Sequence, residues 1–253
     1  MAGRDDSVGA LVAGGIALAL LAGAGGAALA RLGWPDDPGA AVGAALTAGQ
    51  LQLVVHLLAV VGHRRMGGQA GGARPGERFG WANWITMARA AVACAIAAQL
   101  SLAGPALAAP ALWAMAAALT AALALDGVDG WVARRTGTAS AFGARFDMEI
   151  DAATLLVVSA LAWQLGVAGA WVLAIGLMRY AFVVAGGAWA ALRAPLPESA
   201  RRKAVCVVQG AALVAALVPA LPLALRQGGL ALALALLAWS FAVDVLWLAR
   251  RRG

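Results

Sequence analysis

Residues 126–151 read DGVDGWVARRTGTASAFGARFDMEID, and the rest of the chain is best interpreted around them. They place four aspartates in a polypeptide that is 63% hydrophobic: Asp126, Asp129, Asp147 and Asp151. A charged side chain at the centre of a membrane helix costs about 2.5–3.5 kcal/mol on insertion scales. Four carboxylates this close together therefore require a compensating partner or a wet cavity.

The spacing of these residues predicts two helices joined by a short turn. One face of the first helix, an arc of about 140°, carries two acids and three neighbours: Asp126, Asp129, Gly130, Ala133 and Arg134. A stripe on the second helix, at intervals of four residues, carries Gly143, Asp147 and Asp151. The polar segment 135–140 predicts the turn. Two such helices would direct the four carboxylates toward one point, beside small residues that leave room for a ligand.

Carboxylate oxygens are hard ligands that suit Mg²⁺ or Mn²⁺, and four of them suffice for two ions. A solvated acidic loop is the alternative interpretation. It is disfavoured because a loop has no reason to keep its acids at helical intervals.

The motif D-x-x-D-G-x-x-A-R, followed after eight residues by G-x-x-x-D-x-x-x-D, resembles the signature of the CDP-alcohol phosphotransferases. All its fixed positions are matched: Asp126, Asp129, Gly130, Ala133, Arg134, Gly143, Asp147 and Asp151. The resemblance implies transfer of a phosphatidyl group from CDP-diacylglycerol to an alcohol acceptor, with release of CMP, in phospholipid biosynthesis. It also implies that Asp126, Asp129 and Asp147 bind metal, and that Asp151 is the general base and touches the second metal ion.

The same resemblance implies positions for the donor nucleotide. Arg134 would meet the donor phosphates, while Gly130, Ala133 and Gly143 would make space for cytidine. Residues 83–89, NWITMAR, are similar to the N-x-x-T-x-x-R start of the family's first core helix, so Asn83 and Thr86 are expected near the diphosphate. An interfacial Trp84 with a polar helix cap is the alternative interpretation of this stretch.

Composition indicates an all-α, polytopic membrane protein. Only 12% of the 253 residues are charged, and the mean hydropathy is +0.83. Stretches of about 20 apolar residues predict eight membrane-spanning helices at 8–30, 40–62, 83–104, 107–125, 150–167, 169–192, 204–223 and 229–249. The resemblance implies a six-helix core, which leaves two extra helices ahead of it.

Three segments follow from this pattern. Residues 1–62 would be two accessory transmembrane helices, 63–82 a cytoplasmic linker rich in Gly and Arg, and 83–253 the core. Gly39 and Gly43 are spaced for close helix packing, inside the chain or at the edge of a homodimer. The first span is interpreted as a retained helix, although residues 28–30 (ALA) have the form of a signal-peptide cleavage site.

Arginine placement predicts the orientation. With both termini inside, all but four of the 19 Lys and Arg residues lie on the cytoplasmic side. Arg31 and Arg226 lie outside, and Arg89 and Arg179 lie within spans. The aspartates then face the cytoplasm at the cell membrane, and the net charge of +7 needs no nucleic acid as a partner.

The acceptor pocket is the least determined part of the site. Arg179 lies near mid-span with no acid in its own helix, and Arg202 and Lys203 gather near the cytoplasmic end of the next one. These residues predict an acceptor that carries phosphate: glycerol 3-phosphate first, then inositol phosphate or phosphatidylglycerol. Anchoring of the basic cluster on anionic lipid is the alternative interpretation.

Two other classes of membrane protein bury acids. A UbiA-like prenyltransferase also uses aspartates and Mg²⁺, but its two motifs lie far apart in sequence, whereas Asp129 and Asp147 are close. A transporter lines a path with acids, but these four cluster at one membrane face and no inverted repeat is visible. Cys94 and Cys206 lie in apolar spans and indicate no disulfide, and His56 and His63 lack the neighbours of a metal site.

Overall fold

A computed structural model describes residues 2–67, 79–102, 107–136, 140–194 and 196–250, without the side chains of 2–9, 66–67, 128–136 and 141. The chain divides into two compact units, Met1–Asp151 and Ala152–Gly253. The division falls inside one helix, so that the acidic first half of that helix belongs to the first unit.

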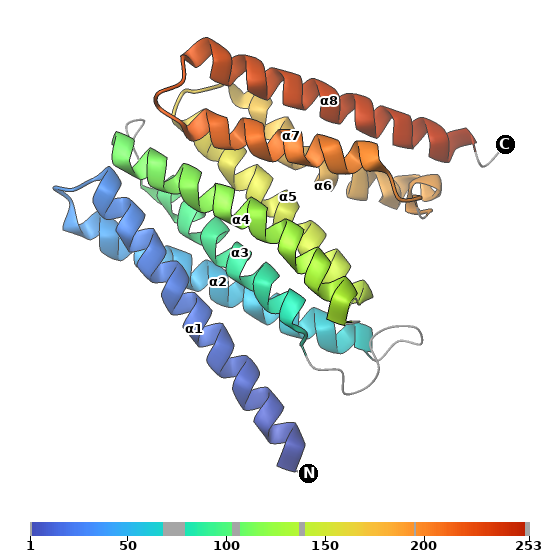
Figure 1. Cartoon of the computed structure of the whole chain (residues 1–253), viewed down its shortest axis with the longest axis horizontal. Helices are drawn as coiled ribbons and strands as arrows, with labels where there is room; N and C mark the ends of the chain where they lie inside the picture. Colours follow the sequence, from blue (N-terminus) through green and yellow to red (C-terminus); the bar gives the residue numbers. More distant parts are fainter. Residues whose placement is uncertain (1, 68–78, 103–106, 137–139, 195, 251–253) are drawn as a thin grey trace. The chain divides into compact units, whose positions relative to one another are not determined.

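The described residues form eight α-helices and no strand, which confirms the predicted all-α fold (Figure 1). The α-helices are α1 (Ala2–Gly33), α2 (Pro38–Gly67), α3 (Trp81–Ala97), α4 (Ala109–Thr136), α5 (Ala141–Gln164), α6 (Ala174–Ala188), α7 (Ala200–Leu217) and α8 (Leu223–Arg250). Three short 3₁₀ helices accompany them: η1 (Ala98–Ser101), η2 (Ala170–Leu173) and η3 (Ala190–Arg193).

Six helical segments of the described chain are long and apolar enough to cross a membrane: Ala10–Gly33, Pro38–Arg65, Trp81–Ser101, Ala109–Gly127, Ala170–Ala188 and Leu223–Arg250. The predicted spans 150–167 and 204–223 fall on α5 and α7, which are not among the six. Helix α7 begins with the charged turn ARRK, and the first half of α5 carries Arg145, Asp147, Glu149 and Asp151, so that only the later parts of both helices are apolar. The expectation of a multi-pass membrane protein holds, with six long apolar helices instead of eight.

In the first unit, small side chains hold α1 and α2 together. A Cβ atom on Gly26 of α1 would lie 2.8 Å from the carbonyl oxygen of Ala44 on α2, and one on Gly23 would lie 3.0 Å from that of Ala45. Such close backbone approach is how membrane helices associate when no hydrophobic force drives them together. Gly43 makes no such approach, because nothing described lies within 4 Å of its added Cβ, so of its two predicted roles the homodimer edge stays a prediction.

Two glutamines tie α1 and α2 to the third helix. The buried Gln52 of α2 donates to the carbonyl oxygen of Met87 on α3 at 3.2 Å. Gln99, buried in η1 directly after α3, donates to the carbonyl oxygen of Gly26 on α1 at 3.1 Å. Hydrogen bonds of this kind are stabilising inside a membrane because water is absent there. Helices α1 and α2 are thus integrated with α3, and α4 packs on α3 as well.

In the second unit, a charged cluster joins α7 to α8. Arg201 and Arg202 at the start of α7 both pair with Asp244 of α8, the latter at 3.1 Å. The Arg201 guanidinium also lies 5.6 Å from the ring centre of Trp239. Because Asp244 is buried, these pairs fix the N-terminal turn of α7 against α8.

Candidate metal and phosphate site

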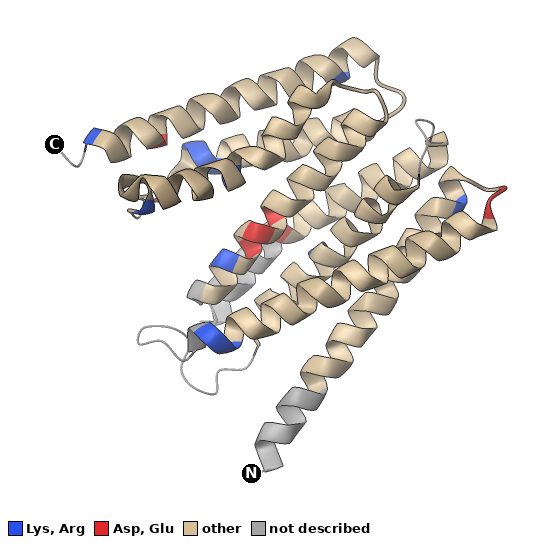
Figure 2. Cartoon of the chain, turned by 180° about the vertical axis from the view of Figure 1, so that it is seen from behind, with Lys and Arg blue, Asp and Glu red and all other residues tan. Residues whose placement is uncertain are grey.

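Three of the four predicted aspartates meet in the first unit. Asp126 lies on α4, which continues as one helix past the predicted end of its span at 125, and Asp147 and Asp151 lie one turn apart on α5. A carboxylate oxygen from each lies within 4.8 Å of the others, and all three side chains are half-buried. Figure 2 shows acidic residues gathered on α4 and α5 in a chain whose helices are otherwise mostly uncharged.

A buried arginine of α3 links the three acids. Arg89, which is 5% exposed, places its Nη1 2.8 Å from Asp126 Oδ1 and 2.6 Å from Asp147 Oδ1, while its Nη2 pairs with Asp151. The planar fork of a guanidinium suits this task, because one rigid group reaches several carboxylate oxygens at once. Helices α3, α4 and α5 are therefore joined at a single charged point.

The charges at this point leave room for a cation. Within the part of the chain that the structure describes, three carboxylates share one guanidinium, so two negative charges remain uncompensated when all three acids are ionised. Oxygen ligands at this spacing fit Mg²⁺ or Mn²⁺, and a divalent ion would supply the missing charge. The donor set thus fits the predicted metal, with Asp126, Asp147 and Asp151 as the ligands that the structure brings together.

The polar start of α3 contacts the same cluster. Thr86 donates to the carbonyl oxygen of Ala82 at 3.1 Å, and its hydroxyl lies 3.4 Å from Asp147 Oδ1. Asn83 faces Gly143 so closely that a Cβ atom on this glycine would lie 2.8 Å from Asn83 Oδ1. Thr86 thus contacts one of the acids and Asn83 lies beside Gly143, while their predicted place near the diphosphate stays a prediction.

Local sequence explains where α5 begins. Ser140 precedes the helix, and its Oγ accepts a hydrogen bond from the backbone N–H of Gly143 at 3.0 Å. This is the usual contact of an N-terminal capping serine. The cap fixes the first turn of α5 and so the positions of Asp147 and Asp151, one and two turns farther along.

Four predicted site residues have side chains outside the described part of the chain: Asp129, Gly130, Ala133 and Arg134. Their backbone continues α4, which is the helix that their spacing predicts. Their roles as metal ligand, nucleotide neighbours and phosphate ligand stay predictions.

The three residues predicted for an acceptor phosphate belong to the second unit. Arg179 is half-buried on α6. Arg202 contacts Asp244 and the carbonyl oxygen of Pro197, and the exposed Lys203 lies 3.5 Å from Glu198. Asp244 therefore already engages one of the two predicted phosphate ligands on α7.

Sequence reasoning included Arg89 in the N-x-x-T-x-x-R motif without counting it among the site residues, and it missed Asp244. Arg89 was visible as an arginine in an apolar span, where a charge implies a nearby partner, and its place three residues after Thr86 puts both on one face of α3. Asp244 is the single acid of the predicted span 229–249 and carries the same signal.

Comparison with known proteins agrees with this geometry. The family model described as CDP-alcohol phosphatidyltransferase matches residues 79–252, a range that contains Arg89, all four aspartates and the arginines of α6 and α7. No curated protein and no solved structure matches the chain. Helices α1 and α2 precede the matched range.

Proposed function

Because the chain belongs to the CDP-alcohol phosphatidyltransferase family, we propose that it transfers a phosphatidyl group from CDP-diacylglycerol to an alcohol and releases CMP. Enzymes of this family are phosphotransferases embedded in membranes, and their substrates are lipid-linked. The observation that carries the proposal is the convergence of Asp126, Asp147 and Asp151 on Arg89 inside the matched range.

The proposed metal ligands are Asp126, Asp129, Asp147 and Asp151, with two Mg²⁺ or Mn²⁺ ions as the expected complement. When bound, such ions would neutralise charge on the diphosphate of the donor. The Arg89 guanidinium keeps three carboxylates of α4 and α5 together, which places their oxygens before the substrate arrives.

The transfer itself exchanges a phosphoanhydride bond of the donor for a phosphoester bond to the acceptor. The acceptor hydroxyl oxygen forms a bond to the β-phosphorus of the donor, and the bond between this phosphorus and the oxygen of CMP breaks. Asp151 would take the hydroxyl proton as general base. Arg134 would hold the donor phosphates, and Gly130, Ala133 and Gly143 would border the cytidine, with Asn83 and Thr86 beside the diphosphate.

For the acceptor we propose a phosphorylated alcohol: glycerol 3-phosphate first, then inositol phosphate or phosphatidylglycerol. Arg179, Arg202 and Lys203 are the proposed ligands of its phosphate. Because Arg202 contacts Asp244, a phosphate bound there would share the guanidinium with this carboxylate.

We also propose a cytoplasmic active site in the cell membrane, with both chain termini on the same side. The distribution of Lys and Arg supports this orientation. Residues 1–62 then form an accessory pair of helices, and the linker 63–82 connects this pair to the catalytic core of residues 83–253. We further propose that the chain acts as a homodimer.

The test is an acceptor panel. Purified protein in nanodiscs receives CDP-diacylglycerol, Mg²⁺ and one alcohol at a time, and CMP is quantified. We expect CMP with a phosphorylated acceptor, none after EDTA, and recovery with Mn²⁺. Arg179→Ala should raise the KM for that acceptor about ten- to a hundredfold and leave the KM for CDP-diacylglycerol unchanged. Preference for free inositol would overturn the acceptor assignment, and an absence of CMP with every alcohol would overturn the function.

A further inference from the structure

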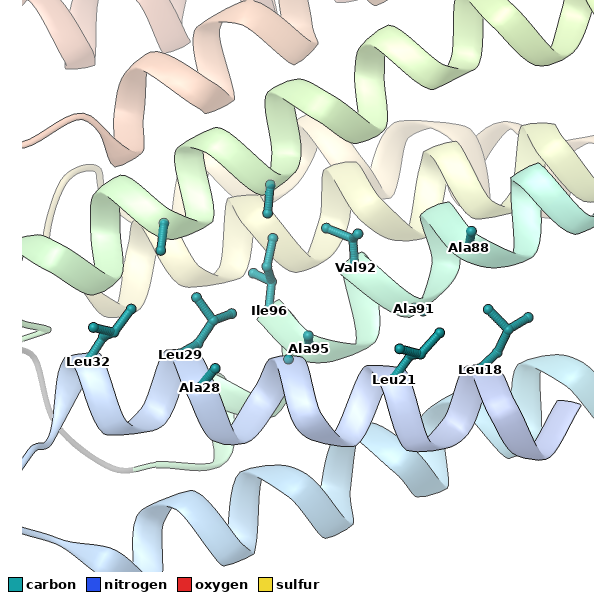
Figure 3. A pocket seen from close by; sticks show the side chains of 13 residues that line it. Leu18, Leu21, Ala28, Leu29, Leu32, Ala88, Ala91, Val92, Ala95 and Ile96 are labelled. Carbon is teal, nitrogen blue, oxygen red and sulfur yellow. The ribbon is translucent and has the colours of Figure 1, made fainter. Parts of the chain in front are cut away.

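An apolar groove of about 370 Å³ lies between α1, α3 and α4 of the first unit. Its walls contain only Gly, Ala, Val, Leu and Ile side chains. In Figure 3, the leucines of α1, among them Leu21 and Leu29, face the small side chains of α3, among them Ala88 and Val92. A groove with no polar wall is suited to a hydrocarbon and offers nothing to a polar ligand.

The groove exists because α1 runs alongside α3 in a fixed register. Gly14 of α1 packs directly on Trp84 of α3, and a Cβ atom on Gly25 would lie 3.4 Å from Ala95 Cβ. Eleven residues separate the two contacts on each helix, so α1 and α3 are parallel. The short alanine side chains of α3 and α4 leave a gap between the helices, and the longer leucine side chains of α1 line its other side.

The groove is open on its outer side. Leu21, one of its wall residues, is 64% exposed. Because α1, α3 and α4 each contain a segment long and apolar enough to cross a membrane, the medium outside this opening is the lipid bilayer. A lipid can therefore enter from the side without passing through water.

The length of the groove matches one lipid chain. Its lining extends from Ala88 to Ile96 on α3, about 12 Å at the rise of an α-helix, and from Leu18 to Leu32 on α1, about 21 Å. One leaflet of a hydrocarbon core is about 15 Å thick. A single acyl chain of a membrane lipid would fill such a groove.

One end of the groove adjoins the acid cluster. Ala88, the first lining residue of α3, directly precedes Arg89, whose guanidinium contacts the three aspartates. On the wheel of α3, Arg89 lies about 20° from Ile96 and about 60° from Val92, so it borders the groove face. A lipid whose head group lies at the acids therefore has an apolar path for its chain along the same helix.

We propose that this groove seats one acyl chain of the lipid donor, an inference that rests on the function proposed above. Helix α1 lies ahead of the matched residues 79–252, so the groove needs a wall that the family domain alone does not supply. Lipid tails are as apolar as leucine, so the groove adds little affinity. Its contribution is to align the donor with the acids, which affects the rate.

The test fills the groove far from the acids. Ala118 of α4 lines it, eight residues or about 12 Å along the helix from Asp126. Ala118→Phe should lower kcat/KM for CDP-dioleoylglycerol about tenfold. It should spare CDP-dioctanoylglycerol, because chains roughly half as long as one leaflet end before this point. The matched control is Ala117→Phe, at an exposed neighbour that does not line the groove.

A second pair of variants tests the α1 wall, with Ala28→Phe inside the groove and Ala24→Phe at an exposed position outside it. Selective loss with the long-chain donor in Ala118→Phe and Ala28→Phe alone supports the proposal. An equal loss of activity with both donors, or no loss with either donor, overturns the groove proposal. In both cases, CMP release by the wild-type protein leaves the proposed function standing.

Photo-crosslinking gives a readout that needs no turnover. CDP-diacylglycerol with a diazirine in its acyl chain should label α1 and α4 beside the groove, and unlabelled CDP-diacylglycerol should compete while phosphatidylcholine does not. Equal competition by phosphatidylcholine would show an ordinary bilayer lipid in the groove and overturn the proposal. If the wild type releases no CMP from either donor, the proposed function fails, and this competition alone decides what the groove binds.

Discussion

Arg89 contributes most to the candidate site among the residues that the structure describes. It is almost fully buried, and it contacts acids from two other helices. A buried charge is tolerated only with partners, and partners held by one guanidinium lose their own position when it is removed. The site and the packing of α3, α4 and α5 therefore depend on the same side chain.

Replacement of Arg89 should destabilise the protein. Arg89→Ala should lower the free energy of unfolding by about 2–3 kcal/mol, less than the roughly 3–5 kcal/mol of fully buried pairs, because the three aspartates keep 28–43% exposure. The free energy of unfolding of Arg89→Lys should lie between those of the wild type and Arg89→Ala, since an ammonium keeps the charge but lacks the planar fork. Thermal unfolding in detergent measures both.

A double variant distinguishes charge imbalance from simple loss of packing. Adding Asp126→Asn to Arg89→Ala should recover part of the lost stability, because it removes one unpaired carboxylate. Wild-type stability in Arg89→Ala would contradict the role of Arg89 as the link between three helices.

The carboxylates themselves should be essential for turnover. Asp126→Asn, Asp147→Asn and Asp151→Asn should each keep less than about a tenth of the CMP release, because a neutral amide cannot balance a divalent cation. Asp129→Asn, a variant of the fourth predicted ligand, should behave in the same way. The control is Glu149→Gln, an exposed acid on the same helix as Asp147 and Asp151. An Asn variant at full activity would remove that residue from the site.

At the scale of helices, sequence periodicity predicted most of what the structure contains. The helical spacing of Asp126 relative to Asp129, and of Asp147 relative to Asp151, predicted two helices with a turn between them, and α4 and α5 end and begin at that turn. The spacing of the acids is informative because each carboxylate in an apolar chain needs a compensating partner.

Contacts between helices were less predictable. Gly39 and Gly43 have the spacing of a packing motif, yet Gly23 and Gly26 make the close approach to α2. Composition cannot tell which small residues face a partner when glycine and alanine occur on every face of a helix. The register of α3 against α4, which brings Arg89 to Asp126, is likewise set by the packing between these two helices.

The α1–α2 contact allows a matched test. Gly26→Leu should destabilise the protein by about 1–3 kcal/mol, because its Cβ atom would lie 2.8 Å from the Ala44 carbonyl oxygen. Gly43→Leu, with nothing within 4 Å of its Cβ, should leave thermal unfolding unchanged or slightly improve it. Equal melting temperatures for the two variants would contradict the packing described.

At the scale of the whole molecule, orientation decides whether a nucleotide-linked substrate can reach the acids. The bias of Lys and Arg predicts that the turn between α4 and α5 faces the cytoplasm and that the loop 218–222 faces outward. Cysteines replacing Thr138 and Ala220 test this, in a background where Cys94 and Cys206 are changed to serine.

An impermeant thiol reagent should label Thr138→Cys only in inverted vesicles or opened cells, and Ala220→Cys in intact cells. Labelling after detergent treatment controls for reactivity. The opposite pattern would reverse the orientation and place the acids on the side away from cytosolic nucleotides.

The central claim is phosphatidyl transfer at the cluster of Asp126, Asp147, Asp151 and Arg89. The most direct measurement follows both products of one reaction, by quantifying CMP and the new phosphodiester lipid after wild-type protein receives CDP-diacylglycerol, Mg²⁺ and glycerol 3-phosphate. We predict equal amounts of the two, and neither with Asp147→Asn. Phosphatidic acid in place of the phosphodiester would show hydrolysis, and products that persist in Asp147→Asn would place the chemistry elsewhere; either result would contradict the account.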